Sequence, residues 1–187
     1  MRAKVCPWYV GYFLVNPFRR LWHNPHVILG PRLALGMTVL EPGPGMGFFT
    51  LEMARRVVPA GRIIAVDIQP TMLARLRRRA EIAGLLDRID IRQVQSDRMG
   101  IDDLEGKVDF VLAFAVVHEL PDVPGFFREV RRAVKPAARM LVAEPRFHVS
   151  PQEFDATLEL AQQAGFKVAE RVEIRMSRSA VLSPSGG

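Results

Sequence analysis

The sequence predicts an α/β domain with a doubly wound, mostly parallel sheet of seven strands and helices on both faces. From residue 38 onward, short apolar runs alternate with longer segments whose apolar residues recur every three or four positions, which is typical of βαβ units. The run 108–117 is apolar at both odd and even positions, whose side chains point to opposite faces of a sheet, as in a central strand covered on both faces. The 187 residues, 49% hydrophobic, are sufficient for one large core. This architecture is Rossmann-like.

The expected elements follow in order along the chain. Strands are expected at 38–40, 62–67, 90–95, 108–114, 139–143, 167–173 and 179–182. Helices are expected at 48–58, 69–83, 123–134 and 151–164. We assign 36–182 to this domain and the Ser/Gly-rich end, 183–187, to a flexible tail.

The first 35 residues differ in composition from the rest. No acid precedes Glu41, whereas five bases, both tryptophans and both tyrosines do. The Asn-Pro pairs at 16–17 and 24–25 suit helix starts, with asparagine as N-cap and proline as first helical residue. So many aromatic side chains on a short segment need cover. We therefore expect 1–35 to be a basic, aromatic helical lid that lies against the sheet domain or over its ligand.

Composition also excludes several classes of protein. No apolar run approaches the roughly 20 residues of a membrane helix, so no membrane partner is expected. Pro7 interrupts the apolar stretch after Arg2 and Lys4, which disfavours a secretory signal. The single cysteine, Cys6, cannot form an internal disulfide and suits a reducing cytoplasm. Cys6 and the four histidines lack the spacing of a metal site, so no metal is expected.

A glycine-rich loop follows the first expected strand. Residues 41–47 read Glu-Pro-Gly-Pro-Gly-Met-Gly and run directly into a helix. Glycine is needed where backbone turns tightly and approaches a ligand closely. The G-x-G-x-G spacing differs from the G-x-G-x-x-G of dinucleotide-binding folds, and no Gly-Lys-Ser/Thr of a P-loop follows. A nicotinamide oxidoreductase is therefore the least favoured enzyme.

Three acids fall at the carboxyl ends of expected strands, the edge where an open α/β sheet binds its ligand. Glu41 would repel a pyrophosphate but suits a ligand with a cationic amine or sulfonium. Asp67 lies twenty residues after Gly47, a distance at which an acid accepts hydrogen bonds from ribose hydroxyls. Asp97 follows the third strand.

The ordered set of motifs resembles the class I S-adenosylmethionine-dependent methyltransferases, especially the small UbiE-like group that acts on small molecules. The resemblance covers residues 36–182 and includes V-L-E-P-G-P-G-M-G, I-A-V-D-I, Q-S-D, D-F-V-L-A-F-A-V-V-H-E-L-P-D, F-F-R-E-V-R-R-A-V-K-P and M-L-V-A-E-P. It implies S-adenosylmethionine as cofactor and S-adenosylhomocysteine as product. It also implies that Glu41 and the loop of Gly43, Gly45 and Gly47 hold the methionine part.

The resemblance implies further cofactor contacts. Asp67 is expected on the ribose diol, Ile68 against the adenine ring and Asp97 on the adenine amine. Phe114 ends the fourth strand, where the family's backbone often contacts the methionine amine. The usual residue at that position is small or polar, so this chain departs from the pattern there.

Methyl transfer is an in-line displacement for which a protein supplies alignment, exclusion of water and in some reactions a base. Candidate bases are His118 and Glu119 after the fourth strand, and Glu144 and His148 after the fifth. Histidine suits deprotonation near neutral pH. A hydrogen-bonded structural role is the alternative for His118.

A small-molecule acceptor is expected because few residues lie outside the core to form a large substrate domain. One alternative is an RNA or protein methyltransferase, which the net charge of +6 and the arginines within 75–79 would serve. Nearby acids favour a solvated helix face there, so nucleic acid is disfavoured as a partner. The other alternative is a non-catalytic cofactor- or nucleic-acid-binding module that keeps the fold.

Overall fold

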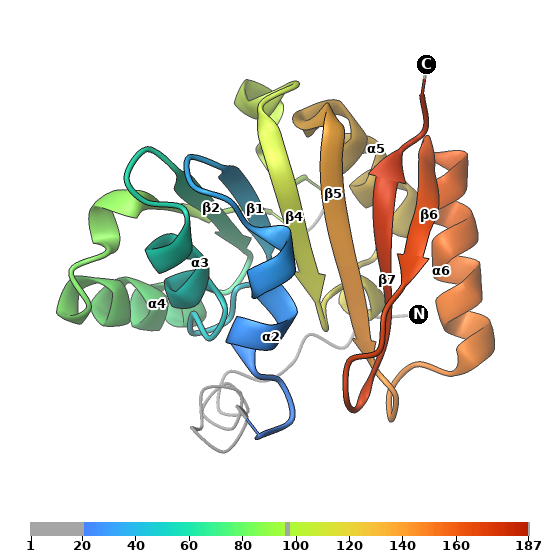
Figure 1. Ribbon diagram of the computed structural model, residues 1–187, viewed down its shortest axis with the longest axis horizontal. Helices are drawn as coiled ribbons and strands as arrows, with labels where there is room; N and C mark the ends of the chain where they lie inside the picture. Colours follow the sequence, from blue (N-terminus) through green and yellow to red (C-terminus); the bar gives the residue numbers. More distant parts are fainter. Residues whose placement is uncertain (1–20, 96–97, 187) are drawn as a thin grey trace.

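The computed structural model describes residues 21–95 and 98–186 and confirms the predicted sheet. Seven strands lie in the order β3-β2-β1-β4-β5-β7-β6 (Figure 1). The pairings among β1 to β5 are parallel, and β7 runs antiparallel to both of its neighbours. The parallel strands therefore share one carboxyl edge.

The elements have the following bounds. The strands are β1 (Thr38–Pro42), β2 (Arg62–Asp67), β3 (Ile89–Gln93), β4 (Val108–Phe114), β5 (Val134–Pro145), β6 (Phe166–Arg171) and β7 (Ser177–Pro184). The α-helices are α2 (Pro25–Leu29), α3 (Thr50–Arg56), α4 (Pro70–Ile82), α5 (Val123–Ala133) and α6 (Pro151–Gln163). Short 3-10 turns are η3 (Gly30–Arg32), η4 (Leu86–Arg88), η5 (Asp102–Leu104) and η6 (Val117–Glu119).

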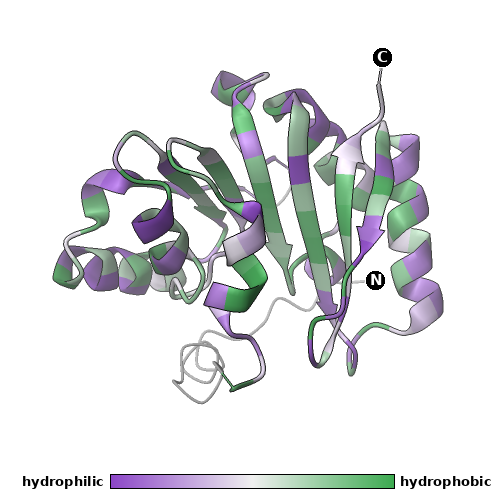
Figure 2. Cartoon of the chain, in the orientation of Figure 1, coloured by the Kyte–Doolittle hydropathy of each residue, from purple (hydrophilic) through white to green (hydrophobic). Residues whose placement is uncertain are grey.

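Two apolar cores lie on opposite faces of the sheet, as the doubly wound prediction requires. Alternate residues of β4 divide between them: Val111 belongs to the core under α5 and α6, and Phe110 to the core under α2, α3 and α4. Figure 2 shows the central strands in green and the outer surfaces of the helices largely in purple. Burial on both faces is why β4 lacks a polar alternation.

Local signals in the sequence start the helices. Asn24 caps α2 by accepting a hydrogen bond from the His26 backbone N–H at 2.9 Å, with Pro25 as first helical residue. Ser150 and Glu153 form a reciprocal capping box on α6. The predicted Asn-Pro helix start at 16–17 lies outside the described residues.

The structure corrects the predicted start of β5 and the predicted end of the domain. β5 begins at Val134 rather than at residue 139, because Val134 pairs with Val108 before a register shift in β4. Ser183, expected in a flexible tail, is buried and continues β7 through Pro184. Leu29, within the segment expected to lie against the sheet domain or over its ligand, is fully buried in the α2–α4 core. No helix in the described part of the chain is long and apolar enough to cross a membrane.

Candidate functional site

The glycine loop joins β1 to α3 at the carboxyl edge of the sheet. Gly43, Gly45 and Gly47 all have positive φ angles, of 65°, 54° and 84°. A Cβ on Gly43 would lie 2.7 Å from Cγ2 of Val116, so the loop can approach the segment after β4 only with glycine there. Nothing lies within 4 Å of the corresponding position on Gly45, which leaves that side of the backbone open to a ligand.

A pocket lies between this loop and the end of β4, and Glu41, Phe49 and Phe114 contribute to its lining. Glu41 is buried and accepts a hydrogen bond of 2.5 Å from the Thr50 hydroxyl at the start of α3. The rings of Phe49 and Phe114 are 4.7 Å apart between centroids. The predicted residues Glu41 and Phe114 therefore give one pocket a carboxylate and an aromatic wall.

Asp67 ends β2 beside the glycine loop. Its carboxylate accepts a hydrogen bond of 2.9 Å from the Gln69 N–H. Burial raises the pKa of Asp67, although backbone hydrogen bonds from Gln69, Gly45 and Ile68 oppose the increase. A desolvated carboxylate of this kind gains from further hydrogen-bond donors. Ile68 follows at the same edge with 36% of its surface exposed, so it is available to a flat ligand.

These groups fit S-adenosylmethionine. The buried Glu41 carboxylate suits a cationic amine or sulfonium, and Asp67 suits a ribose diol. The open side of Gly45 allows a ligand to approach the backbone that lies between them. Asp97, the predicted adenine contact, lies outside the described residues.

The structure brings His118 together with a buried carboxylate. His118 lies on η6 after β4, and its Nδ1 forms a hydrogen bond with Oε2 of Glu144 at the end of β5. Glu144 is only 1% exposed, and its Oε1 accepts a second hydrogen bond, of 2.9 Å, from the Val117 N–H. Glu144 is therefore enclosed, whereas the His118 side chain keeps 22% of its surface exposed.

The other two predicted catalytic residues lie beside His118. Oε1 of Glu119 is 3.8 Å from His118 Nε2, and the His148 ring is 5.8 Å from the His118 ring in an edge-on arrangement. Burial lowers the pKa of His118, but the hydrogen bond and charge of Glu144 and the charge of Glu119 raise it more. The imidazole is therefore protonated more readily than a free histidine.

His23, which sequence reasoning did not select as a site residue, contacts two sides of this edge. Its ring is 4.9 Å from that of Phe114 in a T-shaped arrangement. Its Nε2 lies 3.0 Å from the Arg175 carbonyl and 3.3 Å from the Ser177 hydroxyl. His23 thus lies against the pocket wall and the turn between β6 and β7.

The arginines of α4 divide between two roles. Arg75, Arg77 and Arg78 are exposed. Arg79, predicted to share their solvated face, is half-buried and donates to the Met46 carbonyl in the glycine loop. The apolar periodicity of a helix does not indicate which of its arginines donates to a distant loop, so the contact of Arg79 with Met46 was not predicted.

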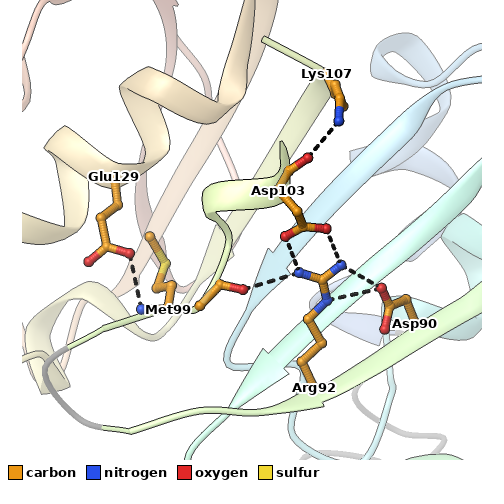
Figure 3. Close-up of polar contacts among 7 residues, drawn as sticks. Asp90, Arg92, Met99, Asp103, Lys107 and Glu129 are labelled. Carbon is orange, nitrogen blue, oxygen red and sulfur yellow. Dashed lines mark hydrogen bonds and ion pairs between the residues drawn. The ribbon is translucent and has the colours of Figure 1, made fainter. Parts of the chain in front are cut away.

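Arg92 on β3 holds the segment that follows this strand (Figure 3). Its guanidinium donates to both carboxylate oxygens of Asp103, at 2.7 and 2.9 Å, and through Nε and Nη2 to Asp90. Nη1 also donates to the Gly100 carbonyl at 3.1 Å. These contacts engage the full donor set of the guanidinium.

A second contact fixes the same segment from the other side. The Met99 N–H donates to Oε2 of Glu129 on α5 at 3.1 Å (Figure 3).

Within 21–95 and 98–186, no three His, Cys, Asp or Glu side chains are grouped to hold a metal ion. Cys6 lies outside these ranges.

Comparison with known proteins agrees with this geometry. The family profile described as "Methyltransferase domain" matches residues 40–142, which is more than half of the chain. A probable S-adenosylmethionine-dependent methyltransferase of Mycolicibacterium smegmatis is 28% identical over 82% of this chain and 62% of its own length. A ubiquinone biosynthesis O-methyltransferase of Methylocella silvestris is 32% identical over 75% of this chain and 53% of its own. The chain thus spans less than two thirds of these relatives.

Solved structures share the fold over nearly the whole chain. A SAM-dependent methyltransferase from Aquifex aeolicus superposes with a TM-score of 0.83 and 25% identity, covering 96% of this chain and 98% of that one. A putative S-adenosylmethionine-dependent methyltransferase from Methanococcus maripaludis gives a TM-score of 0.79 at 16% identity, covering 100% and 98%. The chain belongs to the class I methyltransferases, enzymes whose cofactor is S-adenosylmethionine.

Proposed function

We propose that this methyltransferase acts on a small-molecule acceptor in the manner of the UbiE-like group, with His118 as the base. S-adenosylmethionine supplies a methyl group on a positively charged sulfur, which is already a good electrophile. The observation that carries the proposal is the pairing of His118 with the buried Glu144 at the carboxyl edge. A base oriented by a buried carboxylate is the arrangement expected where a proton must leave a reacting group.

The hydrogen bond to Glu144 determines which imidazole nitrogen of His118 donates and which one can accept a proton. With Nδ1–H donating to Glu144, Nε2 carries the lone pair of the neutral ring and accepts the proton of the acceptor as the acceptor's nucleophilic atom takes the methyl group. The methyl–sulfur bond would break in the same step, and its electron pair would stay on the sulfur of S-adenosylhomocysteine. Glu144 is a positioning residue, because it fixes the tautomer without meeting the acceptor. Glu119 lies 3.8 Å from Nε2 and stabilises the imidazolium after proton transfer.

The pocket wall and the relatives favour a flat acceptor with an ionisable group. Phe49 and Phe114 offer aromatic surface beside the glycine loop, where a planar ring packs well. Relatives named as ubiquinone biosynthesis O-methyltransferase and ubiquinone/menaquinone biosynthesis C-methyltransferase support this class. We also propose that residues 1–35 cover the pocket, which the contact of His23 with Phe114 supports. A cytoplasmic location, proposed from the single cysteine, is compatible with such acceptors.

The test compares His118→Asn with wild type in two assays. Calorimetry should show the same S-adenosylmethionine affinity for both proteins. Release of S-adenosylhomocysteine with a panel of phenols, enols and thiols should fall about 10²- to 10⁴-fold in the variant, the range that general base catalysis supplies. His26→Asn is the matched control, because His26 is an exposed histidine on α2. Equal turnover of wild type and His118→Asn would return His118 to a structural role.

A second candidate is an RNA acceptor, favoured by the exposed Arg75, Arg77 and Arg78 on α4. Binding through phosphate contacts weakens steeply with salt because counterions are released. Filter binding of transfer RNA between 50 and 200 mM salt, for the wild type and for Arg75→Gln/Arg78→Gln, distinguishes an RNA acceptor from a small-molecule acceptor. A salt-dependent affinity that this double variant lowers would favour RNA.

A further inference from the structure

Exposed apolar side chains gather at the carboxyl edge of the sheet. Eight large hydrophobic side chains are exposed among the described residues, and four of them are Leu21, Trp22, Phe147 and Met176. Phe147 is 79% exposed and Leu21 is 68% exposed. Scattered single apolar side chains need no explanation, but a cluster beside an active site indicates a surface that meets something.

Hydrogen bonds of neighbouring residues bring the three segments that carry these side chains to one edge. The Arg146 N–H donates to the Met176 carbonyl at 3.0 Å, and Arg146 Nε donates to the Ser177 carbonyl at 2.9 Å. His23, next to Trp22, contacts the Arg175 carbonyl at 3.0 Å. Figure 1 shows the β5–α6 loop and the β6–β7 turn side by side at this edge. We call the surface formed by Leu21, Trp22, Phe147 and Met176 the apolar rim.

The apolar rim is flanked by positive charge. Arg146 and Arg175 are exposed and adjoin Phe147 and Met176 in the sequence, and the turn before Arg175 contains one acid, Glu173. The chain as a whole carries a net charge of +6. Apolar side chains next to arginines are the combination that inserts into an anionic lipid interface.

The backbone of Met176 supports a role for its exposure. Its φ is 64°, in the left-handed region that favours glycine. A solvent-exposed turn position with this φ is usually occupied by glycine or asparagine, because a side chain there costs conformational free energy. The turn instead carries methionine, a large apolar residue of which 38% remains exposed.

We propose that the apolar rim docks the protein onto the surface of an anionic membrane, with the carboxyl edge and its pocket facing the lipid. A two-fold contact between copies would place the arginines of one copy near those of the other, which is unfavourable. Four protruding side chains on three segments suit a lipid interface, where only insertion depth matters. The sequence expectation of no membrane partner depended on the lack of an apolar run long enough to cross a bilayer. Attachment to a membrane surface requires no such run.

The experiment is cosedimentation of the full chain with vesicles of phosphatidylcholine alone or with 30% phosphatidylglycerol. We expect binding to the anionic vesicles that weakens at high salt. Phe147→Ser/Met176→Gly should lower the partition coefficient tenfold or more, and glycine at 176 suits the φ angle, so folding is preserved. Ile82→Ser is the matched control, since Ile82 is also 79% exposed but lies at the end of α4. Its partition should change less than twofold.

Charge is tested separately from apolar insertion. Arg175→Gln should lower binding to anionic vesicles about fivefold, the equivalent of one basic residue at the surface. Equal binding of wild type to neutral and anionic vesicles would overturn the proposal, as would unchanged binding of Phe147→Ser/Met176→Gly. A wild-type dimer that this variant dissociates in sedimentation velocity would assign the rim to a second copy. The proposal is independent of the role of His118, because vesicle binding requires no turnover.

Discussion

Replacing Glu144 by glutamine tests whether this buried carboxylate holds His118 in its charged form. Glutamine keeps one oxygen, which can still accept from the Val117 N–H, but the charge-assisted bond to His118 Nδ1 is lost. Hydrogen bonds to charged groups contribute about 1.5 to 3 kcal/mol each, so the free energy of unfolding should fall by about 2 kcal/mol near pH 6. Urea denaturation followed by circular dichroism measures this difference.

The pH dependence provides the stricter part of the test. The folded-state pKa of His118 is raised above its ordinary value of 6.5. The stabilisation is therefore fully present below pH 6.5 and is lost as the pH rises through the folded-state pKa. The stability gap between wild type and Glu144→Gln should narrow toward pH 9. Glu119→Gln, a control at 3.8 Å from Nε2, should cost less than about 1 kcal/mol. A gap of constant size from pH 5.5 to 9 would refute the ion pair.

Three further changes have defined outcomes. Asp67→Ala should weaken S-adenosylmethionine binding about tenfold or more in calorimetry, by losing hydrogen bonds to two hydroxyls; equal affinity would remove Asp67 from the cofactor site. Gly43→Ala should lower unfolding stability by about 2–4 kcal/mol, because it combines a positive φ with a 2.7 Å contact, whereas Gly36→Ala, at φ 81° in open space, should cost about 1 kcal/mol. Arg92→Met should cost about 1–2 kcal/mol in low salt, and this cost should be fully present above pH 3.8 and shrink as the pH falls through the lowered folded-state pKa of Asp103. A cost that does not shrink at any pH below 3.8 at which the protein remains folded would exclude the ion pair as its source.

Much of the fold follows from local pattern. β2 and β4 have the predicted bounds, and a glycine shortly before each strand, Gly61 and Gly106, marks its start. β5 is longer than predicted, since the pairing of Val134 with Val108 is a contact across the sheet that periodicity cannot indicate. Ser183 was likewise assigned to the tail by composition, although its backbone pairs with Lys167 of β6.

The positions of the candidate site residues along the sheet could be predicted from the sequence, but the contacts between their side chains could not. Carboxyl ends of strands identify Glu41, Asp67 and His118 as residues of one edge. That Glu144 holds His118 depends on β4 lying next to β5, which is a matter of strand order. The support of the glycine loop by Arg79 depends on how α4 packs, so it also required the structure.

The antiparallel direction of β7 has a consequence for how such an enzyme can diversify. Because β7 starts where β5 ends, with Ser177 opposite Pro145, the connection between β6 and β7 is delivered to the ligand edge. The loops after β1 and β2 lie in the other half of the sheet. A change in the length of residues 172–176 would therefore alter this edge beside β5 while the loops after β1 and β2 keep their geometry.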